Sequence, residues 1–191
     1  MIKLSKTLFD EAKTLGTARH DSNRAAGVPL DFNGDNDPYE MDIEGVAGEM
    51  AFAQHVNADD SEWEKIRTIK PTSALKGEDF GDCDWNGYAW DIKTTPYNSG
   101  HVLVMTSKLM SDKIDGYVLM VGSNGEYECR GCISHGRVLK GIREGRYRMK
   151  SRNTYWVMQA DLMPLPSKPK PAGFDDYTKD QIAKLRKHYD R

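Results

Sequence analysis

Apolar residues recur at the helical period in two stretches near the start of the chain. In 42–56 they fall three and four positions apart, and acidic residues open the stretch, which suits the positive end of a helix dipole. A shorter stretch at 5–15 has the same period. We therefore expect helices at 5–15 and 42–56. The polar connection between them, 17–39, is rich in Asp, Asn and Gly.

The rest of the chain alternates short apolar runs with turn residues, which is typical of strands. The expected strands are 66–69, 82–85, 88–93, 102–106, 117–121, 127–133 and 155–159. A short helix is expected at 134–140, and Thr178-x-x-Gln181 has the form of a capping box for a last helix. Helices, then strands, then helices predict an α/β or α+β fold around one mixed sheet.

Asn86-Gly87 is the strongest local signal, because this dipeptide between two apolar-rich runs predicts a two-residue β-hairpin turn. Alternate side chains on a strand share a face. We therefore expect Asp82 and Asp84 to point to the same side of the first hairpin strand.

The second hairpin strand carries Asp91 and Lys93 on one face. Glu49 lies on the preceding helix, directly after Gly48, whose missing side chain would let that helix approach the sheet closely. Carboxylates can hold Mg²⁺, which neutralises a phosphate and activates water. A nearby lysine can orient that water or stabilise developing negative charge.

Three motifs occur in a characteristic order: Gly48-Glu49-x-Ala-Phe-Ala, Gly81-Asp82, and Asp91-Ile92-Lys93-Thr94-Thr95. Together they resemble the PD-(D/E)XK nuclease superfamily, in particular small nuclease-like proteins from phage genomes. The resemblance spans roughly 40–165. It implies a restriction-endonuclease-like αβββαβ core, with a mixed central sheet flanked by helices, and to this the chain adds a C-terminal helix.

The resemblance also implies a set of site residues. Glu49, Asp82 and Asp91 would bind the metal, and Lys93 would complete the catalytic set. The implied cofactor is Mg²⁺, with Mn²⁺ as a substitute.

Two positions in this set leave alternatives open. Gly81 stands where the family often has proline, so Asp79 and Asp84 are rivals to Asp82, which we prefer for its distance of five residues from the hairpin glycine. Glu44 is the rival to Glu49. The two are five residues apart and about 140° around a helix, so only one can face the sheet squarely.

A basic segment follows the strands. Its nucleic-acid-binding candidates are Arg143, Arg146, Arg148, Lys150 and Arg152. Because the formal net charge of the chain is −2, contact with a polyanion must come from such a local patch. DNA is the partner that we favour.

Other features narrow the class of protein. No apolar run approaches eighteen residues, so no membrane segment is expected. Three cysteines fit a reducing cytoplasm, which would be that of the host if a phage encodes the chain. Cys129-x-x-Cys132-x-x-His135 resembles half a zinc site, but residues three apart on a strand face opposite ways, so we favour buried cysteines.

The expected organisation is a nuclease-like domain at 1–165, with an N-terminal helix and loop at 1–39 and a core at 40–165. A proline-lysine linker at 166–177 and a helix at 178–191 follow. We expect a Mg²⁺-dependent nuclease, a hydrolase of the endonuclease kind that cleaves DNA. The alternative is a catalytically silent nuclease-fold module that binds nucleic acid or a host protein. The sequence leaves a homodimer open.

Overall fold

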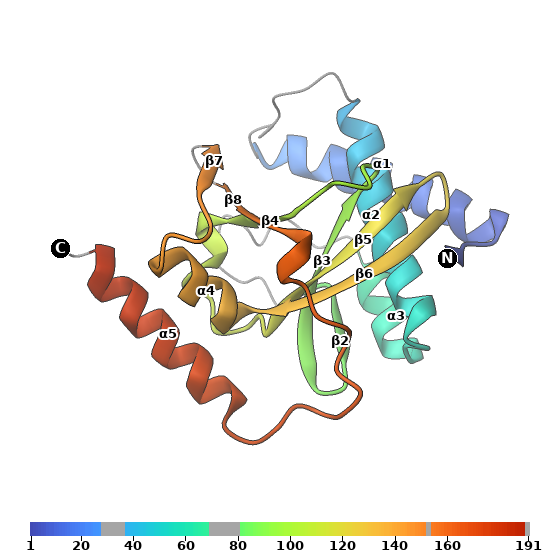
Figure 1. Ribbon diagram of the computed structural model, residues 1–191. Helices are drawn as coiled ribbons and strands as arrows, with labels where there is room; N and C mark the ends of the chain where they lie inside the picture. Colours follow the sequence, from blue (N-terminus) through green and yellow to red (C-terminus); the bar gives the residue numbers. More distant parts are fainter. Residues whose placement is uncertain (28–36, 69–80, 152–153, 190–191) are drawn as a thin grey trace.

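The computed structural model describes residues 1–27, 37–68, 81–151 and 154–189 (Figure 1). Its helices are α1 (Lys6–Ala25), α2 (Pro38–His55), α3 (Asp60–Arg67), α4 (His135–Arg143) and α5 (Phe174–Tyr189). Two short 3-10 helices also occur, η2 (Thr106–Lys108) and η3 (Gln159–Asp161).

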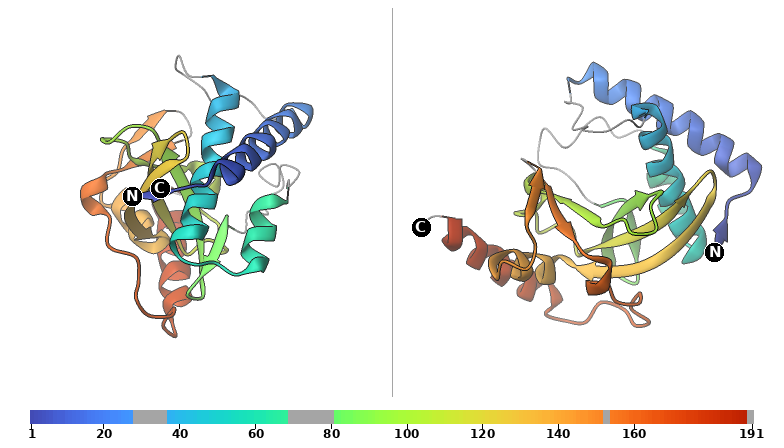
Figure 2. Two further views of the ribbon diagram at one scale, coloured as in Figure 1. Left: turned by 90° about the vertical axis from the view of Figure 1, so that its right-hand side faces the viewer. Right: turned by 45° about the horizontal axis from the view of Figure 1, so that its top comes forward.

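A curled, mixed sheet forms the centre of the fold (Figure 2). Its strands are β1 (Ile2–Lys3), β6 (Glu126–Ser134), β5 (Gly116–Ser123), β3 (Tyr88–Thr95) and β2 (Cys83–Trp85), in that spatial order. β3 and β5 are parallel, and the other neighbours are antiparallel. A second, smaller sheet has the order β4 (Val102–Met105), β8 (Thr154–Val157) and β7 (Met149–Ser151).

The central sheet is buried on both faces, as its central strand β5 makes clear. Val118 and Met120 pack in the core cluster that includes α2, while Tyr117, Leu119 and Val121 pack with α4, α5 and the small sheet. The period of two along a strand therefore divides β5 between two cores.

Helix α2 lies close to β3 because a glycine faces the strand. A Cβ added at Gly48 would lie 1.9 Å from Oγ1 of Thr94, so any side chain there would collide with the sheet. The sequence-based expectation of a close approach at Gly48 matches this contact.

The coarse prediction is confirmed, since a mixed sheet is flanked by helices and a C-terminal helix follows. The hairpin turn at Asn86 and Gly87 is also present, with φ of 53° and 76°. The expectation of one sheet was wrong: β4 and β8 pair with each other, because β1 and β2 occupy the edges of the central sheet.

Three local predictions were wrong. The helix expected at 5–15 continues to Ala25, and Ile66 and Arg67, expected in a strand, close helix α3; Ile69 lies outside the described residues. Helix α5 begins at Phe174, so Thr178 and Gln181 are buried inside it and form no capping box. Phe174, the first residue of α5, packs against the core cluster that includes α2 and contacts the ring of Tyr88 at 5.1 Å between centroids, which favours an earlier helix start.

We predict that Gly48→Ala destabilises the fold by about 1–3 kcal/mol, the usual range for an overpacked site. Gly45→Ala is the matched control on the same helix, because its Cβ would meet nothing within 4 Å. Alanine there should stabilise by up to about 1 kcal/mol through helix propensity. Denaturant unfolding measures both, and equal effects of the two substitutions would contradict the close approach at Gly48.

Candidate active site

A buried carboxylate, Asp91 on β3, forms the centre of the site. Only 1% of its surface is exposed. The Nζ of Lys93 lies 2.8 Å from its Oδ2, and the Nζ of Lys108 lies 2.8 Å from its Oδ1. Burial alone would raise the pKa of Asp91, but the charges of Lys93 and Lys108 and the hydrogen bond from Lys108 outweigh it and hold this pKa well below its usual range. Asp91 is therefore ionised and paired on both oxygens.

Asp82 is a second carboxylate, located directly before β2. Its N–H donates to the carbonyl of Trp90 at 2.7 Å, and its Oδ2 accepts from the N–H of Ile92 at 2.7 Å. Burial, followed by the charges of Glu49 and Asp91, raises the pKa of Asp82 to about 7. Three carboxylates from three segments thus act electrostatically on one another.

Glu49 is the third carboxylate, and it is buried on α2. Arg19 of α1 binds it with both ends of the guanidinium, at 2.6 and 2.9 Å. Burial would lower the pKa of Arg19, but the charge and hydrogen bonds of Glu49 raise it above its ordinary value. The bidentate pair fixes the position of the Glu49 carboxylate.

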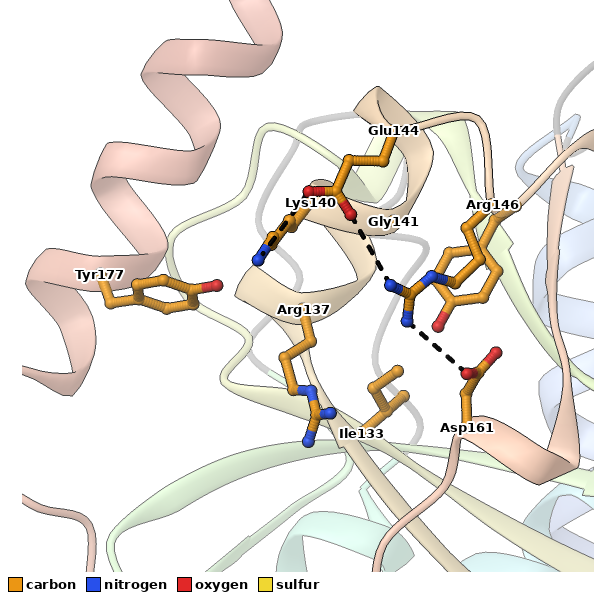
Figure 3. A pocket seen from close by; sticks show the side chains of 9 residues that line it. Ile133, Arg137, Lys140, Gly141, Glu144, Arg146, Asp161 and Tyr177 are labelled. Atoms are coloured by element: carbon orange, nitrogen blue, oxygen red, sulfur yellow. Dashed lines mark ion pairs between the residues drawn. The ribbon is translucent and has the colours of Figure 1, made fainter.

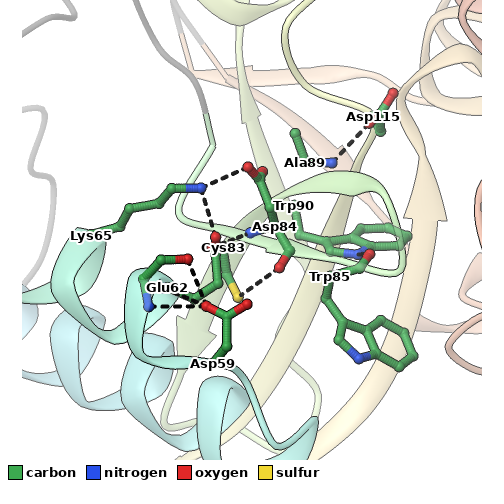
Figure 4. A network of polar contacts seen from close by, with 10 residues as sticks. Asp59, Glu62, Lys65, Cys83, Asp84, Trp85, Ala89, Trp90 and Asp115 are labelled. Atoms are coloured by element: carbon green, nitrogen blue, oxygen red, sulfur yellow. Dashed lines mark hydrogen bonds and ion pairs between the residues drawn. The ribbon is translucent and has the colours of Figure 1, made fainter.

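The rival residues lie in other contacts. Glu44 accepts hydrogen bonds from the hydroxyl of Tyr127 and the N–H of Asn124. Asp84 is exposed and pairs with Lys65 of α3 at 2.6 Å (Figure 4). Asp84 therefore does not share the environment of Asp82, contrary to the expectation from strand alternation, because Asp82 precedes the strand. Asp79 lies outside the described residues.

The donor set suits Mg²⁺ in its chemistry, because all three side chains offer carboxylate oxygens. Across the described part of the chain, however, no group of three or more His, Cys, Asp or Glu side chains is arranged to hold a metal ion. In this arrangement Glu49 is bound to Arg19, and Asp91 to Lys93 and Lys108. To bind a metal, the site would have to release carboxylate oxygens of Glu49 and Asp91 from these cations.

Sequence reasoning missed two residues of this site. Lys108 lies in η2, just after β4, and a single lysine after a strand has no distinguishing pattern. Arg19 falls in the 17–39 stretch expected to be a connection, because the helical period weakens beyond 5–15. In the structure the next residue, His20, pairs with Asp42 of α2 at 2.8 Å, so α1 continues beside α2.

The basic segment is spread over several elements. Arg143 ends α4 and is partly buried, whereas Arg146 and Arg148 are exposed. Nothing is described of the side chain of Lys150, and Arg152 lies outside the described residues.

A small pocket of about 120 Å³ lies beside this segment (Figure 3). Arg146 lines it at 3.7 Å from both Glu144 and Asp161, and Lys140 lies 3.8 Å from Glu144. These acidic side chains offset the basic charge inside the pocket.

The Cys-x-x-Cys-x-x-His segment has a different role from a zinc site. Both ring nitrogens of His135 are engaged, Nδ1 with the hydroxyl of Tyr117 at 2.9 Å and Nε2 with the carbonyl of Leu109 at 3.3 Å. Burial lowers the pKa of His135 to about 4 and raises that of Cys132 to about 11. These groups belong to the core.

No family model, no curated protein and no solved structure matches this chain. Within the described residues, no helix combines the length and the apolar character needed to cross a membrane.

We predict that Asp82 makes stability fall as pH rises. A raised pKa means that the folded state binds its proton more tightly than the unfolded chain, so this stability is complete below about pH 4 and is lost through about pH 7. The loss is at most about 4 kcal/mol for a pKa that rises from about 4 to about 7, and less because the side chain of Asp82 keeps some contact with water.

Asp82→Asn isolates this effect, because its amide oxygen can still accept from the N–H of Ile92. Its stability should fall less than that of the wild type between pH 5 and 8, measured by urea unfolding. His135 contributes an opposite slope at acidic pH in both proteins, so it cancels in the comparison. If the curves of stability against pH for the two proteins ran parallel over this window, the raised pKa of Asp82 would be contradicted.

Proposed function

We propose that this protein is a Mg²⁺-dependent nuclease of the PD-(D/E)XK type that hydrolyses phosphodiester bonds, with DNA as the preferred substrate. One observation carries the proposal: Glu49, Asp82 and Asp91, brought together from a helix and the two arms of a hairpin, interact electrostatically beside Lys93. Carboxylates whose charges act on one another in this way are unfavourable unless cations balance them.

The restriction-endonuclease-like core is part of this proposal. It is supported by the order of α2, the β2–β3 hairpin and the later strands before α4, and by the contact of Gly48 with Thr94. The chain departs from αβββαβ in the separate sheet of β4, β7 and β8 and in the additional strand β6.

Asp82 and Asp91 would hold the ion, and Glu49 would complete its shell directly or through water. Mg²⁺, or Mn²⁺ in its place, would neutralise the scissile phosphate and lower the pKa of the attacking water. Lys93 would orient that water or stabilise charge on the phosphate. Lys108 would position Asp91 through its Oδ1 atom, and Arg19 would position Glu49.

The alternative function is a silent nuclease-fold module that binds nucleic acid or a host protein. A specific observation favours it: the cations Arg19, Lys93 and Lys108 already pair with Glu49 and Asp91. Such a charge-balanced site needs no metal to be stable. A phage origin and a location in the host cytoplasm stay predictions.

Cleavage of single- and double-stranded DNA and RNA with Mg²⁺, Mn²⁺ or EDTA tests the proposal. We predict metal-dependent cutting that Asp91→Ala and Lys93→Ala each reduce at least about a hundredfold, the loss typical of removing one electrostatic contact to a transition state. Asp91→Ala should also lose metal binding, which Lys93→Ala should retain. Calorimetric titration with Mn²⁺ separates these two effects.

Asp84→Ala is the matched control, because it removes a carboxylate from the same hairpin outside the site. It should cut like the wild type, and thermal melting should confirm that each variant is folded. Wild-type cleavage by Asp91→Ala would disprove the site. Salt-sensitive binding without cleavage by the wild type would establish the alternative.

A further inference from the structure

The small sheet has a buried face and an exposed apolar face. On β4, Val102 and Val104 are fully buried, whereas Leu103 is 43% and Met105 38% exposed. On β8, Tyr155 and Val157 are buried, while Trp156 is 37% exposed. A tryptophan at this exposure is placed where it can contact another molecule.

Strand register brings particular side chains next to this tryptophan. Leu103 lies directly opposite Trp156 on β4. On the other side, the N–H of Trp156 donates to the carbonyl of Arg148 at 3.4 Å, so Arg148 is its neighbour on the β7 side. Facing residues of antiparallel strands share a face. The ring of His101 also contacts Trp156 in a tilted arrangement, with centroids 5.3 Å apart and an angle of 46° between the planes.

The charge beside this face indicates what it binds. An exposed basic residue, Arg148, lies at its β7 side, whereas the charge of Arg146 is balanced by Glu144 and Asp161. A second copy of the chain docked face to face would bring two such basic rims together, which is unfavourable. An aromatic platform beside positive charge instead fits single-stranded nucleic acid, whose bases stack and whose phosphates are negative.

Strand β4 also leads along the chain from this face to the candidate active site. Met105, the last residue of β4, directly precedes η2, and Lys108 of η2 binds Asp91 at 2.8 Å. The Cα atoms of Met105 and Lys108 are at most about 11 Å apart, the reach of three residues. A nucleic-acid strand bound along β4 would therefore end near η2, the element whose Lys108 pairs with Asp91.

We propose that the exposed face of β4 and β8 is a binding platform for single-stranded nucleic acid, on which an unpaired base stacks on Trp156 while Arg148 contacts its phosphate. That the bound strand is also the substrate rests on the proposed nuclease function. The binding itself does not.

Fluorescence anisotropy with a labelled 15-nucleotide oligo-dT and a 15-base-pair duplex, both in EDTA, tests the platform. The single strand should bind more tightly than the duplex. Trp156→Leu should weaken single-strand binding about 5- to 150-fold, the range for one stacked base. Trp156→Phe should retain most of the affinity, because phenylalanine keeps an aromatic face that leucine lacks.

Two further variants separate stacking from other contacts. Met41→Ala removes an exposed apolar side chain from α2, outside this face, and should bind as the wild type does. Arg148→Gln should reduce the slope of log affinity against log salt by about 0.7, the value for one phosphate contact on a single strand. Trp156→Leu should leave that slope unchanged, and thermal melting should verify the fold of each variant.

Wild-type affinity of Trp156→Leu, or no binding of oligo-dT by the wild type, would overturn the platform. So would a concentration-dependent dimer that both Trp156→Leu and Leu103→Ala abolish in sedimentation, because that result would make the face a self-association surface. Metal-dependent cutting unaffected by Trp156→Leu would leave the nuclease standing without the platform. Single-strand binding through Trp156 without cutting would leave the platform standing without the nuclease.

Discussion

The pairing of one buried carboxylate with two lysines constrains the rest of this structure. Leaving Asp91 without a partner would cost several kcal/mol, because a buried charge loses its hydration. Lys93 comes from the same strand, but Lys108 comes from η2, at the end of the small sheet. Pairing both oxygens of Asp91 therefore brings η2 against β3, and the two sheets meet at this charge.

The same constraint extends to the helices. Glu49 faces the hairpin only because α2 lies close to β3 at Gly48, and its charge is met by Arg19 from α1. Asp82 instead accepts a hydrogen bond from a backbone N–H. Its pKa is raised, because burial and the charges of Glu49 and Asp91 disfavour its ionised form. A divalent cation would compete with arginine and lysine for the same oxygens, so metal binding and the release of these side chains would be linked.

The sequence predicted those parts of the site that follow from local pattern. Asn86-Gly87 has a turn chemistry with few alternatives, and the period of 42–56 admits one helix. The position of Lys108 could not be predicted, because it depends on the pairing of β4 with β8, fifty residues apart in the chain. The strand expected near Ile66 failed for a related reason: an apolar run that short fits a helix or a strand, and packing decides between them.

Strand β4 connects the chemistry of the buried site with that of the exposed face. One end leads to Lys108 and a water-poor cluster of charges, while its middle presents Leu103 beside Trp156 to solvent. The two environments respond to different variables. Stacking on an exposed ring depends little on salt, whereas phosphate contacts weaken steeply as salt rises and buried ion pairs are hardly screened. Salt, pH and aromatic substitution can therefore be varied separately, because the exposed face at Trp156 and the buried charges at Asp91 respond to different variables.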